Sequence, residues 1–522
     1  MRFSLSDDVT SLSETEFVEE AQKPFQFSNN RIKINKAVII AAGNGSRLNG
    51  YQNHRPKPLL NVAGLPLLKR VILSGKRNGV TEFVIVIGYQ AERIRQSIHP
   101  DELGVKITWV VNKEWKRQNG VSVLKAEKYV TGNFFLFMSD HIFDYRILEE
   151  ITYPRLGNDY AAMLCVDSDL NRVNDINDAT KVYTRDERLL RIGKNLDTYN
   201  AIDIGIFVCT PKIFDALRES QAAGDESLSG GIRVLADRGE MATVDIGDRV
   251  WQDVDTISDV RYAEKLLLHA TRSPKDGIIA RTINRPISNF ISKWLVKTPF
   301  TPNQLSFLNF LLTLFVAWLV AGGRPVNTII GGFLFQFASI FDGCDGEVAT
   351  LKLKDSRQGA MFDTIMDYLS YIVFIIGVTI GAYHTTHNSW MWVFMAGIVI
   401  FVVIAVKFGL KYLGNDSGSM KDFAHEMNQM KHENHQKWYL KFFSALHHIG
   451  RRDMFSFLTM LIMFSGSIVL YYWMMIGAVL LMCLGITLSA LYFMSTRSRS
   501  EAPPGKSDLI LQNGIPVPEE QI

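Results

Sequence analysis

Cysteine is scarce in this sequence, and the few cysteines do not form a motif. The 522-residue chain has four of them, and no two have C-x-x-C spacing, so neither a disulfide framework nor a cysteine-based zinc site is expected. The histidines between residues 425 and 448 do not supply the H-E-x-x-H zinc motif, because His432 and His435 are one residue too close together. We expect that segment to be a solvated polar linker.

An excess of charge of either sign is also absent. The formal net charge is only +3, which argues against a nucleic-acid partner, since such partners call for a strongly basic domain. The N-terminal residues contain no apolar core of the kind found in signal peptides. The first domain is therefore expected to stay on the side of the membrane where it is synthesised.

Long apolar runs are missing from the first half of the chain but dominate the second half. Six apolar stretches occupy residues 304–323, 326–341, 364–383, 389–409, 454–472 and 474–494. Most of them approach the roughly 20 residues that a helix needs to cross a bilayer. The pattern predicts an all-α, six-helix transmembrane domain over residues 304–495.

Lysine and arginine are distributed unevenly among the connections between these stretches. Lys352, Lys354 and Arg357 lie between the second and third stretches, whereas the connections on the opposite side contain only Arg324. Positive residues favour the cytoplasmic side of a membrane. We therefore expect a multi-pass cell membrane protein with both termini and both active sites cytoplasmic.

The remaining segments are assigned from their composition. Residues 1–34 are expected to be a disordered tail, residues 35–272 a soluble domain, residues 273–303 a linker and residues 496–522 a cytoplasmic tail. Within the linker, residues 286–297 place apolar side chains at helical spacing, at Ile287, Phe290, Ile291, Trp294 and Leu295. This spacing predicts an amphipathic helix in the membrane interface, and a helix packed on a soluble core is the alternative.

The soluble domain begins with a strand that runs into a glycine-rich loop. Short β-branched runs alternate with helix-length segments, which favours an α/β fold with a Rossmann-like mixed sheet. After the strand 38–40 the chain reads AAGNGSR, a loop that contains Ala42, Gly43, Gly45 and Arg47. Glycines there let backbone N–H groups approach phosphate oxygens. The loop is neither a P-loop nor G-x-G-x-x-G, since neither motif is complete.

The loop and its continuation, AAGNGSR…RPKPLLNVAG, resemble the signature of nucleotidyltransferases that activate sugar 1-phosphates and alcohol phosphates. The resemblance extends over about residues 36 to 268. It implies phosphate-binding and catalytic roles for Arg47 and Lys57, and nucleotide or substrate contacts for Ala42, Gly43, Gly45, Asn119, Gly120, Ser122 and Lys194. It further implies that Asp140, Asp253 and Asp255 bind Mg²⁺.

The implied chemistry agrees with these residue types. The phosphate of an alcohol phosphate would attack the α-phosphorus of a nucleoside triphosphate, and no covalent protein nucleophile is needed. Both reactants are anions, so Mg²⁺, Arg47, Lys57 and Lys194 would neutralise charge and hold the reactants in line.

Four carboxylates lie where the second apolar stretch ends and the third begins. Asp342 and Asp345 share one helix face, and Asp363 and Asp367 share another. Carboxylates at membrane depth are costly and are by default functional. A set of oxygen ligands suits Mg²⁺ or Mn²⁺, so the two faces together predict a metal site.

The spacing D-x2-D-G-x2-A-T-x8-G-x3-D-x3-D resembles the signature of the CDP-alcohol phosphotransferases, which have six membrane helices. The resemblance implies that Asp342, Asp345 and Asp363 bind metal and that Asp367 is the general base. It also implies that Gly346, Ala349 and Gly359 lie along the nucleotide and that Arg451 and Arg452 bind the acceptor phosphate. Thr350 departs from the usual arginine, and Lys352 or Lys354 is the expected substitute.

The order of the two domains links their reactions. If the product of the first domain is the substrate of the second, the nucleotide is CTP and the intermediate is a CDP-alcohol. The fusion resembles the bifunctional inositol-1-phosphate cytidylyltransferase and di-inositol-phosphate phosphate synthase family, which implies inositol 1-phosphate as both alcohol phosphate and acceptor.

Two other interpretations stay open at this stage. A lipid acceptor would give a phospholipid, and a membrane scaffold or transporter with a degenerate nucleotide-sensing domain is the second alternative. The expected partners are CTP, the alcohol phosphate, the CDP-alcohol and membrane lipid, and a homodimer through the membrane domain is a further expectation.

Overall fold

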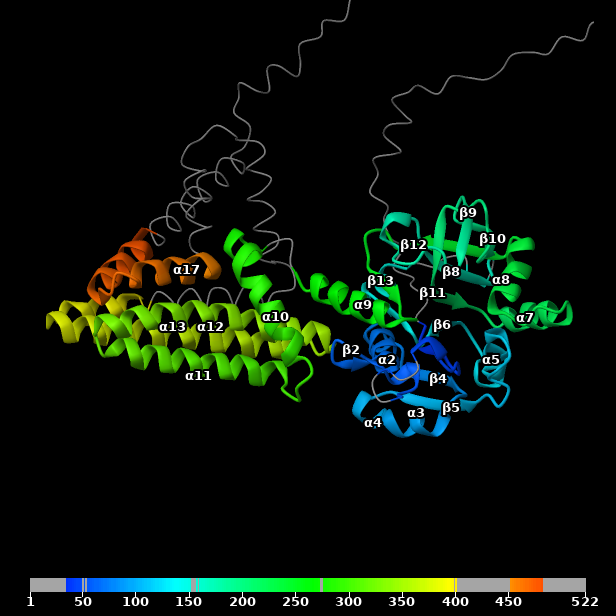
Figure 1. Cartoon of the computed structure of the whole chain (residues 1–522), viewed down its shortest axis with the longest axis horizontal. Helices are drawn as coiled ribbons and strands as arrows, with labels where there is room; N and C mark the ends of the chain where they lie inside the picture. Colours follow the sequence, from blue (N-terminus) through cyan, green and yellow to red (C-terminus); the bar gives the residue numbers. More distant parts are fainter. Residues whose placement is uncertain are drawn as a thin grey trace, which may run out of the picture. The chain divides into compact units, whose positions relative to one another are not determined.

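The computed structural model describes residues 34–48, 51, 54–151, 156–157, 159–272, 276–398, 400 and 451–481. The chain divides into two compact units, shown with their elements in Figure 1. Unit one contains residues 1–61 and 66–263, and unit two contains residues 62–65 and 264–522. The predicted N-terminal tail up to residue 33, the histidine-containing linker and the C-terminal tail lie outside the described residues.

Unit one is built on a nine-stranded sheet with the order β5-β4-β1-β6-β11-β8-β12-β10-β9. β1 (Lys36–Ala41) runs parallel to both of its neighbours, β4 (Glu82–Ile87) and β6 (Phe134–Met138). β11 (Ala201–Cys209) is antiparallel to β6 and to β8 (Ala162–Asp167). The predicted mixed α/β sheet is therefore confirmed.

Helices bury both faces of this sheet. Consecutive residues of β1 alternate between two apolar cores: Ile39 packs in the core that includes α2 (Leu67–Arg77), and Val38 packs in the core that includes α7 (Lys212–Ala222) and α8 (Leu228–Asp237). A strand buried on both faces needs apolar residues at successive positions, which explains runs such as EFVIVI in β4.

The other strands of unit one have these bounds: β5 Lys106–Val111, β7 His141–Phe143, β9 Lys181–Arg185, β10 Arg188–Gly193, β12 Met241–Asp245 and β13 Trp251–Asp253. The other helices are α3 Ala91–Ser97, α4 Pro100–Leu103, α5 Asn119–Lys125, α6 Arg146–Glu150 and α9 Ile257–Ala270, which crosses the division at residue 263. β2 (Asn61–Val62) and β3 (Leu65–Pro66) pair as a hairpin with a two-residue loop. β7 and β13 form a separate antiparallel pair, in which Asp253 lies opposite His141.

Apart from residues 62–65 of the β2–β3 hairpin, unit two is mainly helical in its described residues. Its elements include a π-helical turn (Ala280–Asn284), α10 (Arg285–Leu295), α11 (Pro302–Ala321), α12 (Pro325–Leu351), α13 (Arg357–Thr386), α17 (Arg452–Met463) and a helix from Ile468 to Leu481. Residues 390–398 and 400 are also helical. A capping box at Thr301 and Gln304 begins α11, with Pro302 in its first turn.

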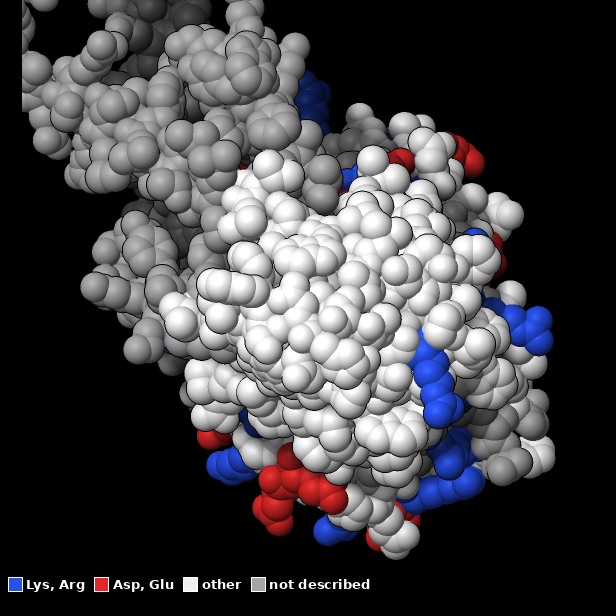
Figure 2. All heavy atoms as spheres, turned by 90° about the vertical axis from the view of Figure 1, so that its left-hand side faces the viewer, with Lys and Arg blue, Asp and Glu red and all other residues white. Residues whose placement is uncertain are grey.

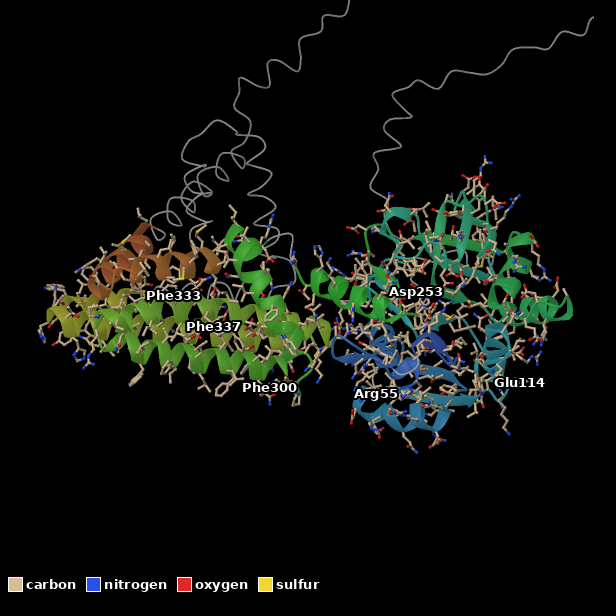
Figure 3. All side chains as sticks on the ribbon, in the orientation of Figure 1. Arg55, Glu114, Asp253, Phe300, Phe333 and Phe337 are labelled. Carbon is tan, nitrogen blue, oxygen red and sulfur yellow. The ribbon has the colours of Figure 1, made fainter. Side chains whose placement is uncertain are left out.

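Two of these helices, α11 and α13, are long and apolar enough to cross a membrane. Large apolar side chains on the bundle surface remain exposed, among them Phe315 and Trp318 of α11 and Phe333 and Phe337 of α12, the latter two labelled in Figure 3. The face in Figure 2 is dominated by uncharged residues, with charged ones toward its edges. Such a surface suits lipid better than water, and the six-span arrangement stays a prediction.

The predicted connection between the fifth and sixth stretches is wrong. The boundary between the apolar stretches 454–472 and 474–494 predicts a connection around residues 471–473, but Tyr471 and Tyr472 are helical and buried. The helix instead breaks between Met463 and Ile468, where Gly466 has φ of +74°. Glycine adopts this left-handed conformation without the steric penalty of other residues, so Ser465-Gly466-Ser467 is the local reason for the break.

Candidate active sites

Lys57 lies between two carboxylates in unit one. Its Nζ is 2.5 Å from Oδ2 of Asp140 and also forms an ion pair with Asp255. Asp140 follows the carboxyl end of β6, Lys57 begins a short 3₁₀ helix, and Asp255 follows β13. Three segments that are far apart in the sequence therefore meet at one point, as the nucleotidyltransferase signature implied.

The charges in this cluster support one another. Burial opposes the positive charge of Lys57, but Asp140 and Asp255 outweigh it and hold the lysine pKa above its usual range. Burial likewise opposes the charge of Asp140, yet Lys57 and His141 hold the pKa of that carboxyl well below its usual range. Both groups are therefore charged at neutral pH.

The glycine loop brings backbone close to this cluster. Gly45 has φ of +56°, and a Cβ at this position would lie 2.6 Å from the Cβ of Lys57. Only glycine fits at such a distance in this conformation. A Cβ on Gly43 would meet no atom within 4 Å, so the backbone at Gly43 is open to a ligand, as expected for a phosphate-binding loop.

Asp178 joins two predicted phosphate-binding side chains, and no sequence motif marks it. It forms ion pairs with Arg47 and with Lys194, the latter at 2.8 Å. Hydrogen bonds from Arg47 and then Lys194 lower the pKa of Asp178 to about 2. Arg47 also reaches Asp255 at 3.4 Å, so Arg47, Lys57 and Lys194 belong to one continuous charged network.

His141 was also missed by the sequence reasoning, although it follows the predicted metal ligand directly. Its Nδ1 is 2.9 Å from Oδ1 of Asp140, and its ring stacks on Trp251 at a centroid distance of 6.2 Å. Burial raises the pKa of Asp253, which lies opposite His141, and raises that of Asp203 to about 6. The contact with Nδ1 of His141 holds Asp140 in one orientation. His141 thus lies among three acidic residues, Asp140, Asp203 and Asp253.

Gly205 limits the space around His141 and supplies a test of its position. Gly205 has φ of +71°, and an added Cβ would lie 2.7 Å from the imidazole ring. We expect Gly205→Ala to destabilise the fold by about 1–3 kcal/mol through backbone strain and, in addition, to displace His141 and reduce nucleotide activation. Thermal unfolding and pyrophosphate release measure the two effects.

Gly239→Ala is the matched control for this prediction. Gly239 has a similar φ of +72°, but a Cβ there would meet nothing within 4 Å. It should show the strain alone, with normal nucleotide activation. Equal activity in the two alanine variants would contradict the role assigned to His141.

The predicted nucleotide-contact residues lie at the start of α5. The side chain of Asn119 accepts a hydrogen bond from the backbone N–H of Leu228 at 2.9 Å, and Ser122 is buried and accepts one from Asn112. A Cβ on Gly120 would lie 2.4 Å from the carbonyl oxygen of Glu226. Asn119 and Gly120 thus hold α5 against residues 226–228 at the start of α8, and Ser122 holds it to Asn112 after β5. Their contact with a nucleotide stays a prediction.

The membrane-domain carboxylates converge in unit two. Asp342, Asp345 and Asp363 each place one oxygen within 4.8 Å of the others. Ser306 donates to Asp345, and Asn309 donates to Asp342 at 3.2 Å, both from α11. These two polar residues were missed, although polar residues one turn apart in an apolar helix are a recognisable signal.

These residues fit a divalent cation. All three side chains offer oxygen ligands, which Mg²⁺ and Mn²⁺ prefer. One carboxylate oxygen of Asp363 is buried and has no hydrogen-bond donor among the described residues. A buried carboxylate oxygen needs a positive partner or a donor, and a cation held by the three aspartates would supply it.

Arg452 lies directly at this cluster. Its Nη1 is 2.7 Å from Oδ2 of Asp342 and also pairs with Asp367, and its guanidinium lies 5.8 Å from the ring centroid of Tyr371. Arg451 instead pairs with Asp453 at 3.6 Å. The structure thus brings Arg452, but not Arg451, onto the carboxylates that the signature predicted.

Lys352 is not a substitute for the arginine that Thr350 replaces. Its Nζ is buried and donates to the backbone carbonyls of Thr298 and Phe300 at 2.8 and 2.9 Å. That alternative was wrong, because the lysine holds the segment before α11. Lys354 is exposed and stays the other candidate, while Thr350 donates to the carbonyl of Gly346 at 3.1 Å.

The signature glycines differ in their surroundings. A Cβ on Gly346 would meet no atom within 4 Å, whereas one on Gly359 would lie 3.1 Å from Oγ of Ser356 and 3.4 Å from Oδ1 of Asn303. Gly346 is exposed and Ala349 is partly exposed on the same helix. This leaves the surface at Gly346 free for a ligand, and the nucleotide contact itself stays a prediction.

Comparison with known proteins gives matches to both halves. A family model for the CDP-alcohol phosphatidyltransferases matches residues 300–421, and one for the MobA-like NTP transferase domain matches residues 37–227. The chain is 37% identical over 351 residues to a bifunctional IPC transferase and DIPP synthase of Rubrobacter xylanophilus, covering 66% of this chain and 77% of that protein.

Further relatives carry the same description. The protein of Aquifex aeolicus is 36% identical, with 64% of this chain and 74% of the relative covered. The protein of Thermococcus kodakarensis is 32% identical, with 72% and 81% covered. Among solved structures, the inositol-1-phosphate CTP transferase from T. maritima aligns with 27% identity and a TM-score of 0.41, covering 45% of this chain and 97% of that one.

Proposed function

We propose a two-step inositol phosphate reaction for this chain, because it belongs to the family of bifunctional IPC transferases and DIPP synthases. It is an enzyme with a nucleotidyltransferase domain and a CDP-alcohol phosphotransferase domain. In the first step, CTP and inositol 1-phosphate give CDP-inositol and pyrophosphate. In the second step, the phosphoinositol group is transferred to another inositol 1-phosphate, and CMP is released.

The charged network of unit one supports the first step. Lys57, held between Asp140 and Asp255, brings positive charge to the point where the glycine loop exposes its backbone. When the two substrates bind, Arg47 and Lys194 give up their ion pairs with Asp178 and pair with the substrate phosphates instead. The neutralised phosphates can then approach each other in line.

The carboxylate cluster of unit two supports the second step, and it is the observation that carries the proposal. Asp342, Asp345 and Asp363 would hold a divalent cation, Mg²⁺ or Mn²⁺, which stabilises charge on the reacting phosphates when bound. Asp367 takes the proton from the acceptor hydroxyl. Arg452 keeps Asp367 in place and presents positive charge to the acceptor phosphate.

A hydrophilic acceptor is favoured over a lipid. The relatives are named DIPP synthases. The family and the apolar helices support a membrane location, and we propose that both sites face the cytoplasm; a homodimer stays a prediction.

The first step can be tested on the purified full-length chain. We expect CTP, Mg²⁺ and inositol 1-phosphate to give CDP-inositol and pyrophosphate, whereas glycerol 3-phosphate and glucose 1-phosphate give little product. Mass spectrometry identifies the nucleotide product. Preferential use of either control phosphate would show that the activated alcohol is not inositol.

A further inference from the structure

Glu347 is a buried carboxylate that the reaction does not use. It lies on α12, two residues after Asp345, and is 1% exposed. Its Oε1 accepts hydrogen bonds from Ser288 at 2.6 Å and from Arg285 at 3.0 Å. With its amide oriented to donate, Asn289 lies 3.0 Å from Oε1 and 3.1 Å from Oε2. All three donors belong to one helix, α10.

The burial of α10 is inverted relative to a helix of a water-soluble protein. Its polar residues Ser288 and Ser292 are 1% and 0% exposed, whereas Phe290 and Trp294 are 66% and 61% exposed. The polar side therefore packs on the protein and the apolar side faces outward. This orientation fits a helix whose outer side is covered by lipid, and it explains why the polar side carries the specific contacts.

Two further contacts fix the residues before α10. Asn284 accepts a hydrogen bond from Gln336 of α12 at 2.9 Å, and Asp453 of α17 accepts one from the backbone N–H of Ala280 at 2.9 Å. Asp453 is adjacent to Arg452. The segment 280–295 is thus attached to α12 and α17, two of the three helices that supply charged groups to the phosphotransfer site.

We propose that Glu347 is a positioning residue for phosphotransfer, which couples the membrane-surface helix α10 to α12 and so sets the positions of Asp342 and Asp345. The inference rests on the proposed function of unit two. A buried ion pair contributes little net stability compared with apolar packing, and its best-attested use is to specify one register or arrangement. Here the arrangement is the register of α10 against the helix that carries the metal ligands.

The test uses the full-length chain and two variants of different severity. Glu347→Gln removes the carboxylate and presents an amide to three donors, and Ser288→Ala removes one donor. Displacement of catalytic groups by about 1 Å costs on the order of 100-fold, so we expect transfer from supplied CDP-inositol to fall about 10- to 100-fold in Glu347→Gln. Ser288→Ala should fall less, and pyrophosphate release in the same protein should not change.

A measurement of metal binding separates positioning from a general structural role. In an Asp140→Asn background, which weakens the predicted metal site of unit one, Mg²⁺ is titrated while the thermal unfolding midpoint is followed. We expect both variants to need more Mg²⁺ for half-maximal stabilisation. Ser292→Ala, on the same buried side of α10 one turn from Ser288, is the matched control and should behave as the parent protein.

The outcomes are distinguishable. If the parent protein does not transfer, the proposed function of unit two fails. If it transfers and both Ser288→Ala and Glu347→Gln keep its rate and Mg²⁺ requirement, the positioning role of Glu347 is wrong. If Glu347→Gln is not recovered as folded protein, Ser288→Ala compared with Ser292→Ala decides.

Discussion

Replacing Asp367 by asparagine should slow phosphoinositol transfer by about 100- to 10,000-fold, the usual cost of losing a general base. Asp367 lies one turn after Asp363 on α13 and pairs with Arg452. Asparagine keeps the shape and can still accept a hydrogen bond from Arg452, but it cannot take a proton. CDP-inositol and metal should therefore bind nearly normally while transfer becomes very slow.

Asp363→Asn is the matched control for Asp367. Asp363 offers one of the three clustered oxygens, so its loss should weaken metal binding and should be partly relieved by more Mg²⁺. CDP-inositol binding and single-turnover transfer are measured on each purified variant. If Asp367→Asn binds weakly but transfers fully at saturating Mg²⁺, Asp367 is a ligand and another group is the base.

Lys57→Ala should slow nucleotide activation by about 1,000-fold and leave transfer from supplied CDP-inositol intact. Removal of one preorganised charged group from a site of developing charge costs about 100- to 1,000-fold. The cost here should be at the upper end, because Asp140 and Asp255 would lose the ammonium group between them. Pyrophosphate release and CMP release, measured separately, report the two steps.

Lys36→Ala controls for the loss of a partly buried lysine. Lys36 pairs with Glu82 at 3.3 Å and donates to the carbonyl of Tyr129, away from Lys57. It should reduce stability slightly and leave both steps active. Loss of both steps together in Lys57→Ala would mean that the two sites do not act independently.

Residues within ordered motifs were predictable, and residues that support them were not. Lys57 and Asp140 could be paired because the glycine loop, the lysine and the aspartate follow a known order along the chain. Asp178 lies in a polar loop without a motif, and only the fold brings it to Arg47 and Lys194. His141 has no spacing signal, since its contact with Asp253 arises from the pairing of β7 and β13.

In the membrane domain, too, the residues of the motif were predictable from the sequence and other features were not. Helical spacing placed Asp342 and Asp345 on one face and Asp363 and Asp367 on another, and the short connection between α12 and α13 let the two faces be predicted as one cluster. Hydropathy did not locate the break at Gly466, since the apolar character continues through Tyr471 and Tyr472. The periodicity predicted α10 but could not show which side faces the protein, and that orientation depends on the burial of Glu347.

The most direct test of the proposed two-step reaction follows isotopically labelled inositol 1-phosphate through both steps. Purified full-length chain is incubated with CTP, Mg²⁺ and ¹³C-labelled inositol 1-phosphate, and the products are identified by mass. The proposed two-step reaction predicts pyrophosphate, CMP and a product that contains two labelled inositols and two phosphates. CDP-inositol that accumulates without this product, or that is consumed only when a lipid acceptor is added, would contradict it.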